Sequence, residues 1–302
     1  MKQLLDLRGI ITVLNTPFTA EDAIDTESLK RNAALALDAG VAGFLVPAMA
    51  SEVGKLSDAE REMMVAAVIS VVKGRVPTIG GASAPTPEDR VRAAQSLIRL
   101  GCEGVLVSIP YENDIRYERD VRDIADLNPG FLMLQDWDSA GFGVPVPLVA
   151  RLFSEIDVFR CLKVEVVPAG VKYSAVLDAT DGRLHVSGGW AEMQMIEALD
   201  RGVHAFMPTA MHAIYTRIFS LYHQGQREKA RDLFARLLPV SAFSNQHLDI
   251  SIHFFKRLLW AQGVFATPRV REPILPFDAY HQRIATELFD LVDELEKESS
   301  GH

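Results

Sequence analysis

Short runs of apolar residues recur along the chain up to residue 207, and longer stretches with helical periodicity separate them. Continuous apolar runs are typical of strands buried on both faces, and their alternation with helices indicates a parallel sheet built from β/α units. The runs are residues 10–14, 43–48, 76–79, 104–109, 131–134, 159–164, 184–187 and 204–207. Because eight such strands close a barrel, the pattern predicts an α/β protein of the (β/α)8 TIM-barrel class.

Local signals support helices between the runs. Ser57 with Glu60 three residues later forms a capping box, and Thr86-Pro87 has the residues that favour a helix start. Gly101 stands where the second of these helices would end. These signals for helix starts and ends therefore agree with the alternation of strands and helices.

After the eighth run the alternation stops. Three stretches then read as helices with no strand between them: residues 215–240, 247–262 and 276–297. We therefore expect a barrel over residues 1–223 and a C-terminal helical extension over residues 224–302. Because no linker rich in Gly, Ser or Pro separates the two, the extension is predicted to pack against the barrel.

Composition and charge narrow the class of protein. Hydrophobic residues make up 48% and charged residues 24% of the 302, the balance of a folded globular protein. The net charge of −9 argues against a nucleic-acid or anionic-membrane surface. No stretch has the length of a signal peptide or membrane span. Cys102 and Cys161 stand in apolar surroundings, which favours buried thiols. We expect a cytoplasmic protein without nucleic-acid or membrane partners.

Sequence motifs for common cofactors are missing. The eight histidines are scattered without a metal-ligand spacing, so no metal site is predicted. Gly80-Gly81 does not form a dinucleotide fingerprint or a phosphate loop. The chemistry is therefore expected to rest on side chains.

Lys163 is the most informative of these side chains. It ends an apolar run at the end of the sixth predicted strand, and active sites of such barrels lie where the strands end. Burial penalises an ammonium, and a pocket that lowers the pKa of a lysine makes its amine a nucleophile toward carbonyls. The alternative is a structural ion pair with Glu165 or another carboxylate.

Several short motifs, in order along the chain, fit one known family. They are Thr16-Pro17-Phe18, Ser51-Glu52 with Leu56-Ser57 and Glu60, Pro110-Tyr111, Leu162-Lys163, Gly188, and the set Lys256, Leu259, Gly263, Arg271 and Pro273. With them the chain resembles the dihydrodipicolinate synthase and N-acetylneuraminate lyase superfamily of pyruvate-dependent Schiff-base aldolases. The resemblance implies an imine between Lys163 and a small 2-oxo acid, no cofactor beyond that imine, and a homotetramer or homodimer.

The chain departs from the family pattern after its second predicted strand. Where the family usually has Gly-Thr-Thr-Gly-Glu, this chain has Ala48-Met49-Ala50-Ser51-Glu52, so both threonine hydroxyls are lost. Binding of the substrate carboxylate would then rest on N–H groups around Ala50 and Ser51, with or without the Ser51 hydroxyl. The alternative is that Ser51 is a turn residue that bonds its own backbone.

Further departures concern proton transfer. Tyr111 is followed by Glu112 and not by the family's second tyrosine, Gln135 stands in place of another tyrosine, and Ala140 replaces an arginine. Carboxylates such as Glu112 could replace the lost acid–base groups, or could be solvated loop residues. The predicted catalytic residues are Lys163, Gln135, Tyr111 and Glu112, and the predicted substrate-binding residues are Met49, Ala50, Ser51, Asp136, Gly188 and Phe206.

Three functions remain open from the sequence. The favoured one is a lyase that forms a Schiff base on Lys163 with pyruvate or a related 2-oxo acid, followed by aldol cleavage or condensation, or by dehydration. The second is 4-hydroxy-tetrahydrodipicolinate synthase of lysine biosynthesis itself, which the replaced residues disfavour. The third is a barrel that binds a metabolite without turnover.

Overall fold

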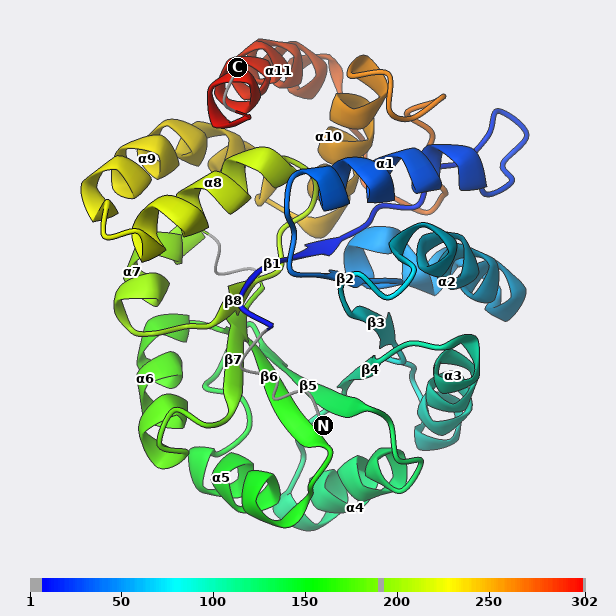
Figure 1. The fold of residues 1–302 in the computed structure, drawn as a ribbon. Helices are drawn as coiled ribbons and strands as arrows, with labels where there is room; N and C mark the ends of the chain where they lie inside the picture. The colour runs from blue at the N-terminus through cyan, green and yellow to red at the C-terminus, as the bar shows by residue number, and fades with distance from the viewer. Residues whose placement is uncertain (1–6, 190–192, 301–302) are drawn as a thin grey trace. The chain divides into compact units, whose positions relative to one another are not determined.

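Eight strands form the central sheet. The computed structural model describes residues 7–189 and 193–300, and in it the strands follow one another in chain order as a closed barrel (Figure 1). The strands are β1 Gly9–Val13, β2 Gly43–Leu45, β3 Thr78–Gly81, β4 Gly104–Ser108, β5 Phe131–Asp138, β6 Phe159–Val166, β7 His185–Gly188 and β8 Ala205–Phe206. The predicted (β/α)8 barrel with a helical extension is confirmed.

Helices follow each strand. They are α1 Thr26–Asp38, α2 Asp58–Val72, α3 Pro87–Leu100, α4 Asp114–Ala125, α5 Val146–Glu155, α6 Ala169–Ala179, α7 Met195–Asp200, α8 His212–His223, α9 Arg227–Ser244, α10 Leu248–Ala261 and α11 Ala279–Ser299. Two short 3-10 helices, η2 Met49–Ser51 and η3 Val53–Lys55, precede α2. The single helix expected over residues 215–240 is wrong, because Gly225 adopts a positive φ of 76° between α8 and α9.

Contacts along the chain define two compact units. Unit 1 comprises residues 1–9 and 77–207, and unit 2 comprises residues 10–76 and 208–302. Unit 1 therefore holds β3 to β8, and unit 2 holds β2, nearly all of β1, and the helices of the extension. The predicted boundary between residues 223 and 224 stays a prediction.

Within unit 1 the strand register decides which side chains share a face. Gln135 of β5 pairs with Lys163 of β6, and Lys163 pairs with Ser187 of β7. One residue further, Asp136 pairs with Val164, and Val164 pairs with Gly188. Because successive side chains in a strand point to opposite faces, these two rows face opposite ways. The second row faces the helices, since Asp136 lies 2.9 Å from Lys172 of α6, and helices α3 to α6 line the outside of these strands (Figure 1).

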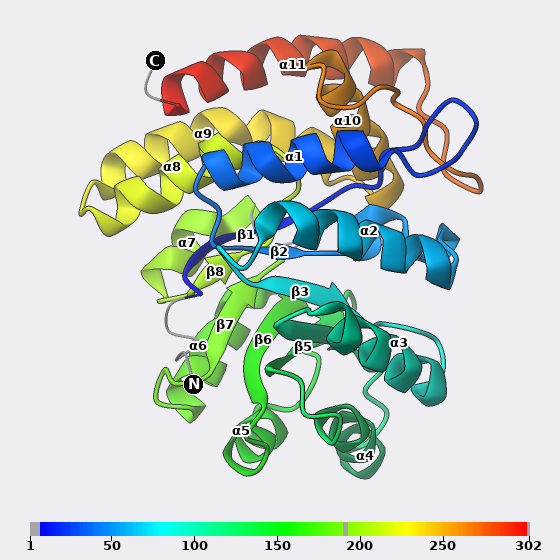
Figure 2. The ribbon, with the colours of Figure 1, turned by 45° about the vertical axis from the view of Figure 1, so that its right-hand side comes forward.

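Within unit 2 the extension packs on the first β/α units. Helix α10 contacts η2, and α8 contacts α1. Helix α11 runs along α8, α9 and α10 (Figure 2). The helix that carries Lys256 thus lies against the turn that follows β2.

The predicted helix caps are present. In α2 the Ser57 hydroxyl accepts from the Glu60 N–H, and the Ser57 N–H donates to the Glu60 carboxylate. In α3 the Thr86 hydroxyl accepts from the Asp89 N–H at 3.1 Å. The capping box at Ser57 and the Thr86-Pro87 pair, both predicted from the sequence, therefore mark the starts of α2 and α3.

The two cysteines have the environment expected of them. Both are free thiols in buried positions. Burial raises the pKa of the Cys102 thiol to about 12 and raises that of Cys161 further. Both thiols are therefore protonated and inert near neutral pH. Among the helices of the described ranges, none has the length and apolar character needed to cross a lipid bilayer.

Candidate active site

Lys163 lies near the carboxyl end of β6 in unit 1, on the face of the sheet turned away from the helices. Its side chain is nearly buried, with 7% of its surface exposed. The ammonium Nζ lies 3.3 Å from Oε1 of Glu165, whose side chain is equally buried. Because Glu165 follows Lys163 by two residues in the same strand, both side chains point to the same face.

Gln135 completes this group from the neighbouring strand. Its side-chain amide donates a hydrogen bond to Oε2 of Glu165. The carboxylate of Glu165 therefore has one oxygen held by a neutral donor and the other next to the Lys163 nitrogen. Gln135, Glu165 and Lys163 form a continuous polar chain across β5 and β6.

Gly188 and Gly189 follow Ser187, and each packs closely against a different neighbour. A Cβ at Gly189 would lie 2.5 Å from Cε of Lys163 and 1.9 Å from Oε1 of Glu165. A Cβ at Gly188 would instead lie 2.7 Å from the Tyr173 hydroxyl of α6. The residue predicted from the sequence was Gly188, but Gly189 is the glycine that adjoins Lys163.

Asp136 is engaged on the helix side of β5. Its carboxylate accepts from the Val144 N–H at 2.9 Å and pairs with the fully buried Lys172. The same Lys172 donates to the carbonyls of Phe142 and Val144. Burial raises the pKa of the Asp136 carboxyl, and the Lys172 ammonium opposes that rise. This group joins the β5–α5 loop to α6, and a role of Asp136 in substrate binding stays a prediction.

Phe206 lies in the same row as Gly188, with which it pairs across β7 and β8. Its side chain is fully buried. A Cβ at Gly188 would come within 3.4 Å of the Phe206 ring. Both residues therefore pack where β7, β8 and α6 meet, and their role in substrate binding stays a prediction.

Tyr111 and Glu112 have partners in their own loop and helix. The Tyr111 hydroxyl donates to Asp114 at 2.6 Å, and this bond raises the pKa of the phenol. Glu112 is mostly exposed and accepts from Arg116 one helical turn later. Within the described part of unit 1, no hydrogen bond or ion pair joins either residue to Lys163, and their catalytic roles stay predictions.

The turn at Met49–Ser51 lies in unit 2. The Ser51 hydroxyl donates to the Leu14 carbonyl at 2.5 Å and accepts from the Ala48 N–H at 3.0 Å. The Ser51 N–H itself donates to the Ala48 carbonyl at 2.9 Å. Over the described residues, the Ala50 N–H has no acceptor. The Ser51 hydroxyl therefore joins its own turn, through the Ala48 N–H, to Leu14, and Ala50 offers the open donor.

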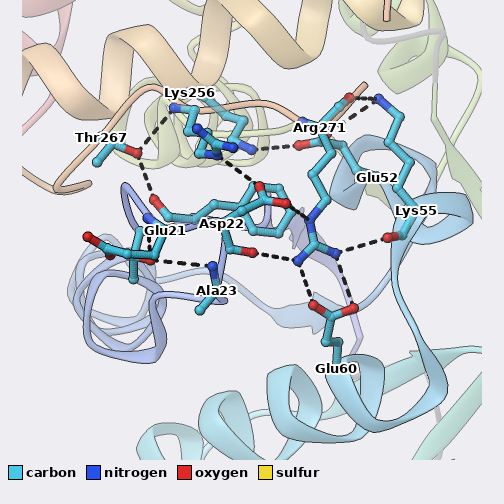
Figure 3. Close-up of polar contacts among 12 residues, drawn as sticks. Glu21, Asp22, Ala23, Glu52, Lys55, Glu60, Lys256, Thr267 and Arg271 are labelled. Carbon is cyan, nitrogen blue, oxygen red and sulfur yellow. Dashed lines mark hydrogen bonds and ion pairs between the residues drawn. The ribbon is translucent and has the colours of Figure 1, made fainter. Parts of the chain in front are cut away.

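Glu52 ends this turn in the left-handed region, with φ 57°. Its Oε1 accepts from Nζ of Lys256 in α10 at 2.5 Å, and both side chains are fully buried. Its Oε2 accepts from the Arg271 N–H at 2.9 Å (Figure 3). Burial lowers the pKa of Lys256 to about 8, and the Glu52 carboxylate opposes this shift. The extension thus anchors the turn through its last residue.

Arg271 extends the same network across unit 2. Its guanidinium donates to Glu60 of α2 at 2.6 Å and to the Asp22 carbonyl at 2.7 Å (Figure 3). The hydrogen bond from Arg271 lowers the pKa of the Glu60 carboxyl to about 2. Both Lys256 Nζ and the Arg271 guanidinium lie over the Phe18 ring, at 4.2 and 4.3 Å from its centre.

A metal centre is not visible in these units. Over residues 7–189 and 193–300, no three His, Cys, Asp or Glu side chains gather in a way that could hold a metal ion.

Comparison with known proteins decides the family. The model of the dihydrodipicolinate synthetase family matches residues 6–290 of the chain. The chain belongs to this family. The prediction of a Schiff-base-forming lyase is confirmed at the level of the family.

Individual relatives have different names. The chain is 28% identical over 301 residues to a 4-hydroxy-tetrahydrodipicolinate synthase of Xanthomonas axonopodis pv. citri, with 94% of each chain covered. It is 27% identical over 280 residues to an L-2-keto-3-deoxyarabonate dehydratase of Azospirillum brasilense, with 88% of each chain covered. A sialic acid aldolase of Ruminococcus gnavus has a TM-score of 0.87 at 15% identity, covering 97% of this chain and 99% of that one. The last likeness shows the fold alone.

Reasoning from the sequence missed two members of the Lys163 group in this family member. Glu165 was considered only as an ion-pair partner, and Ser187, which pairs in register with Lys163, was not considered. The spacing of two residues between Lys163 and Glu165 was a usable signal, because it places both on one face of a strand. Ser187 had no such signal, since its position depends on the register between β6 and β7.

Proposed function

We propose that the protein is a lyase in which Lys163 forms a Schiff base with pyruvate or a related 2-oxo acid, without an external cofactor. The observation that supports this most is the nearly buried Lys163 amine, which lies 3.3 Å from a carboxylate on the sheet face opposite the helices. Such a carboxylate can accept a proton from the ammonium and so release the nucleophilic amine.

The proposed reaction depends on the ability of a protonated imine to accept an electron pair from the neighbouring carbon. The Lys163 amine adds to C2 of the 2-oxo acid, and the carbonyl oxygen leaves as water. The resulting iminium accepts the electron pair released at C3 when a C3 proton is removed or the C3–C4 bond breaks. Cleavage of C3–C4 gives an aldol reaction, and loss of a C4 hydroxyl from the enamine gives dehydration.

The turn at Met49–Ser51 keeps its proposed role in binding the substrate carboxylate. The Ser51 hydroxyl donates to the Leu14 carbonyl and the Ser51 N–H donates to the Ala48 carbonyl, so both donors are engaged. We therefore assign the binding to the open Ala50 N–H and not to the hydroxyl, because backbone N–H groups bind anions without side chains.

The decisive experiment traps the imine. The protein is incubated with pyruvate and borohydride, and intact mass and peptide mapping locate the reduced adduct. We expect one adduct, on Lys163, and none in Lys163→Met. Lys172 serves as an internal control, since it is also buried but is bonded to Asp136 and two carbonyls. No adduct with pyruvate, 2-oxobutyrate or 2-oxoglutarate would contradict the proposal and leave the metabolite-binding barrel.

We favour an aldolase or dehydratase over 4-hydroxy-tetrahydrodipicolinate synthase. Gln135 and Ala140 stand where the resemblance places a proton-carrying tyrosine and a substrate-binding arginine. The relative named as a dehydratase is 27% identical over 88% of the chain, close to the 28% over 94% of the synthase relative, so the preference rests on the two replaced residues. Turnover of 2-keto-3-deoxy sugar acids would support the favoured reading. Condensation of pyruvate with aspartate semialdehyde would support the synthase instead.

The same proposal includes the setting of the enzyme. We propose a cytoplasmic homotetramer or homodimer that binds neither nucleic acid nor membrane. Two buried free thiols and a net charge of −9 agree with that setting. Light scattering coupled to gel filtration measures the assembly, and a mass of one chain would exclude both oligomers.

A further inference from the structure

We propose that Glu165 is the acid–base residue that moves protons between the Lys163 nitrogen and the substrate oxygen while the imine forms. This inference rests on the proposed function and assigns a role that the family's usual hydroxyls would otherwise have. Glu165 touches the reacting nitrogen directly, at 3.3 Å between Oε1 and Nζ. A general base must lie within reach of the proton it removes, and this geometry meets that condition.

The two oxygens of the Glu165 carboxylate face different neighbours. Gln135 donates its amide N–H to Oε2 of Glu165. The Gln135 amide cannot carry a proton as a phenol does, but it fixes the orientation of the carboxylate. Oε1 therefore faces the Lys163 amine, and Gln135 acts as a positioning residue for Glu165.

The glycine beside the pair lets the backbone pack closely against it. A Cβ at Gly189 would collide with both Lys163 Cε and Glu165 Oε1. The backbone at Gly189 therefore helps to hold the two polar ends next to each other.

The proton count balances with one carboxylate. The ammonium of Lys163 carries three protons, of which one remains on the iminium nitrogen. The other two leave with the carbonyl oxygen of the 2-oxo acid as water. Glu165 carries these two protons in turn, taking each from nitrogen and giving it to oxygen, so it ends in the ionised form in which it began.

Other carboxylates near β5 are engaged elsewhere. Asp136 is bonded to Lys172 on the helix side. Asp138 accepts from the N–H groups of Ala140 and Gly143. Of the described carboxylates on β5 and β6, Glu165 is the one whose oxygen lies within hydrogen-bonding reach of Lys163.

The test measures the rate of imine formation with pyruvate, by borohydride trapping at short times. We expect Glu165→Gln, which keeps the size of the side chain, to slow trapping by about 10²–10⁴-fold, the usual contribution of general acid–base catalysis. Glu155→Gln, an exposed glutamate at the end of α5, is the matched control and should trap at the wild-type rate. Thermal unfolding of each variant checks that the fold is retained.

Chemical rescue separates proton transfer from structure. In Glu165→Ala the carboxylate is removed and space is left beside Lys163. Added formate should then restore trapping in a saturable way, whereas a packing role would not respond. Trapping by Glu165→Gln within about threefold of wild type, or no rescue of Glu165→Ala, would overturn the role of Glu165 alone. Failure of the wild-type protein to form any adduct would remove the proposed function and this inference together.

Discussion

Two successive glycines, Gly188 and Gly189, contact different neighbours at the end of β7. A Cβ at Gly188 would collide with the Tyr173 hydroxyl, a rigid group from α6. A Cβ at Gly189 would collide with the flexible ends of Lys163 and Glu165. Because rigid and flexible neighbours respond differently to an added methyl, the two positions have separable effects on folding and on chemistry.

Gly189→Ala should therefore damage the chemistry more than the fold. The new Cβ would push aside Lys163 Cε and Glu165 Oε1, both of which can rotate away. Displacement of reacting groups by about 1 Å costs about 100-fold in rate, so we expect at least that loss in imine trapping and little change in Tm. Gly54→Ala, whose Cβ would meet nothing within 4 Å, is the control. Wild-type trapping by Gly189→Ala would contradict the placement of these groups.

At this scale the sequence predicted the lysine but not its immediate partners' roles. Lys163 was visible because an ammonium at the end of an apolar run is unusual. The apolar pattern of β5 ended at Leu134, so Gln135 was read as lying beyond the strand, whereas β5 continues to Asp138. Backbone pairing with β6 carries the polar residues into the sheet, and hydrophobic periodicity does not report such pairing.

Among the elements, α10 has the clearest effect on another part of its unit. Lys256 of α10 and Glu52 at the end of the 49–52 turn form a fully buried ion pair. Both residues were recognised from the sequence as separate pieces of a family pattern, more than 200 residues apart. Their ion pair joins the extension to the turn at Glu52, the residue with a left-handed φ.

Lys256→Met should destabilise unit 2 strongly. The change leaves the Glu52 carboxylate buried without its ammonium, and breaking such a pair costs about 3–5 kcal/mol. The free energy of unfolding in urea measures the effect. The double variant Glu52→Gln, Lys256→Met should lose less, because no uncompensated charge remains. Lys30→Met removes an exposed pair with Glu27 and should change stability by less than about 1 kcal/mol. Equal losses in Lys256→Met and Lys30→Met would contradict the importance of burial.

The elements themselves were largely predictable. All eight strands lie at the expected runs, because strands buried on both faces leave an unbroken apolar signal. The break between α8 and α9 was missed, since one glycine within a helical pattern does not by itself end a helix. At Gly225 the positive φ and local capping bonds end α8, so the glycine was the available signal for this break.

Across the whole molecule, buried histidines couple folding to pH. Burial lowers the pKa of His185 to about 3 and those of His204 and His212 to about 4. His212 shows why the neutral form is kept, because its Nε2 can donate to Asn32 Oδ1 while its Nδ1 accepts from the Thr12 hydroxyl. The neutral imidazole thus satisfies both bonds, and burial disfavours the charged imidazolium.

The direction of the pH dependence follows from these shifts. A histidine with a lowered folded pKa binds fewer protons in the folded state than in the unfolded state between about pH 4 and 6.5, so stability rises with pH there. Burial raises the pKa of Glu296 to about 7 and that of Asp136 as well, and these two act in the opposite direction. With His253, whose pKa burial also lowers, four histidines outweigh two carboxyls, so we expect the free energy of unfolding to increase from pH 4.5 to 6.5. Urea titrations measure it, and a decrease would contradict this assignment.

Glu296 provides a sharper test of this pH dependence, because its raised pKa changes stability in the direction opposite to the histidines. Its carboxyl lies in α11, hydrogen-bonded by Gln262, and nearby Asp293 adds to the rise in its pKa. Between about pH 4.5 and 7 the folded state holds the Glu296 proton and the unfolded state releases it, so this group lowers stability as pH rises. Glu296→Gln removes that term and should steepen the rise by up to about 1.4 kcal/mol per pH unit. The exposed Glu287→Gln is the control, and the same slope in both variants would exclude a proton on Glu296 in the folded protein.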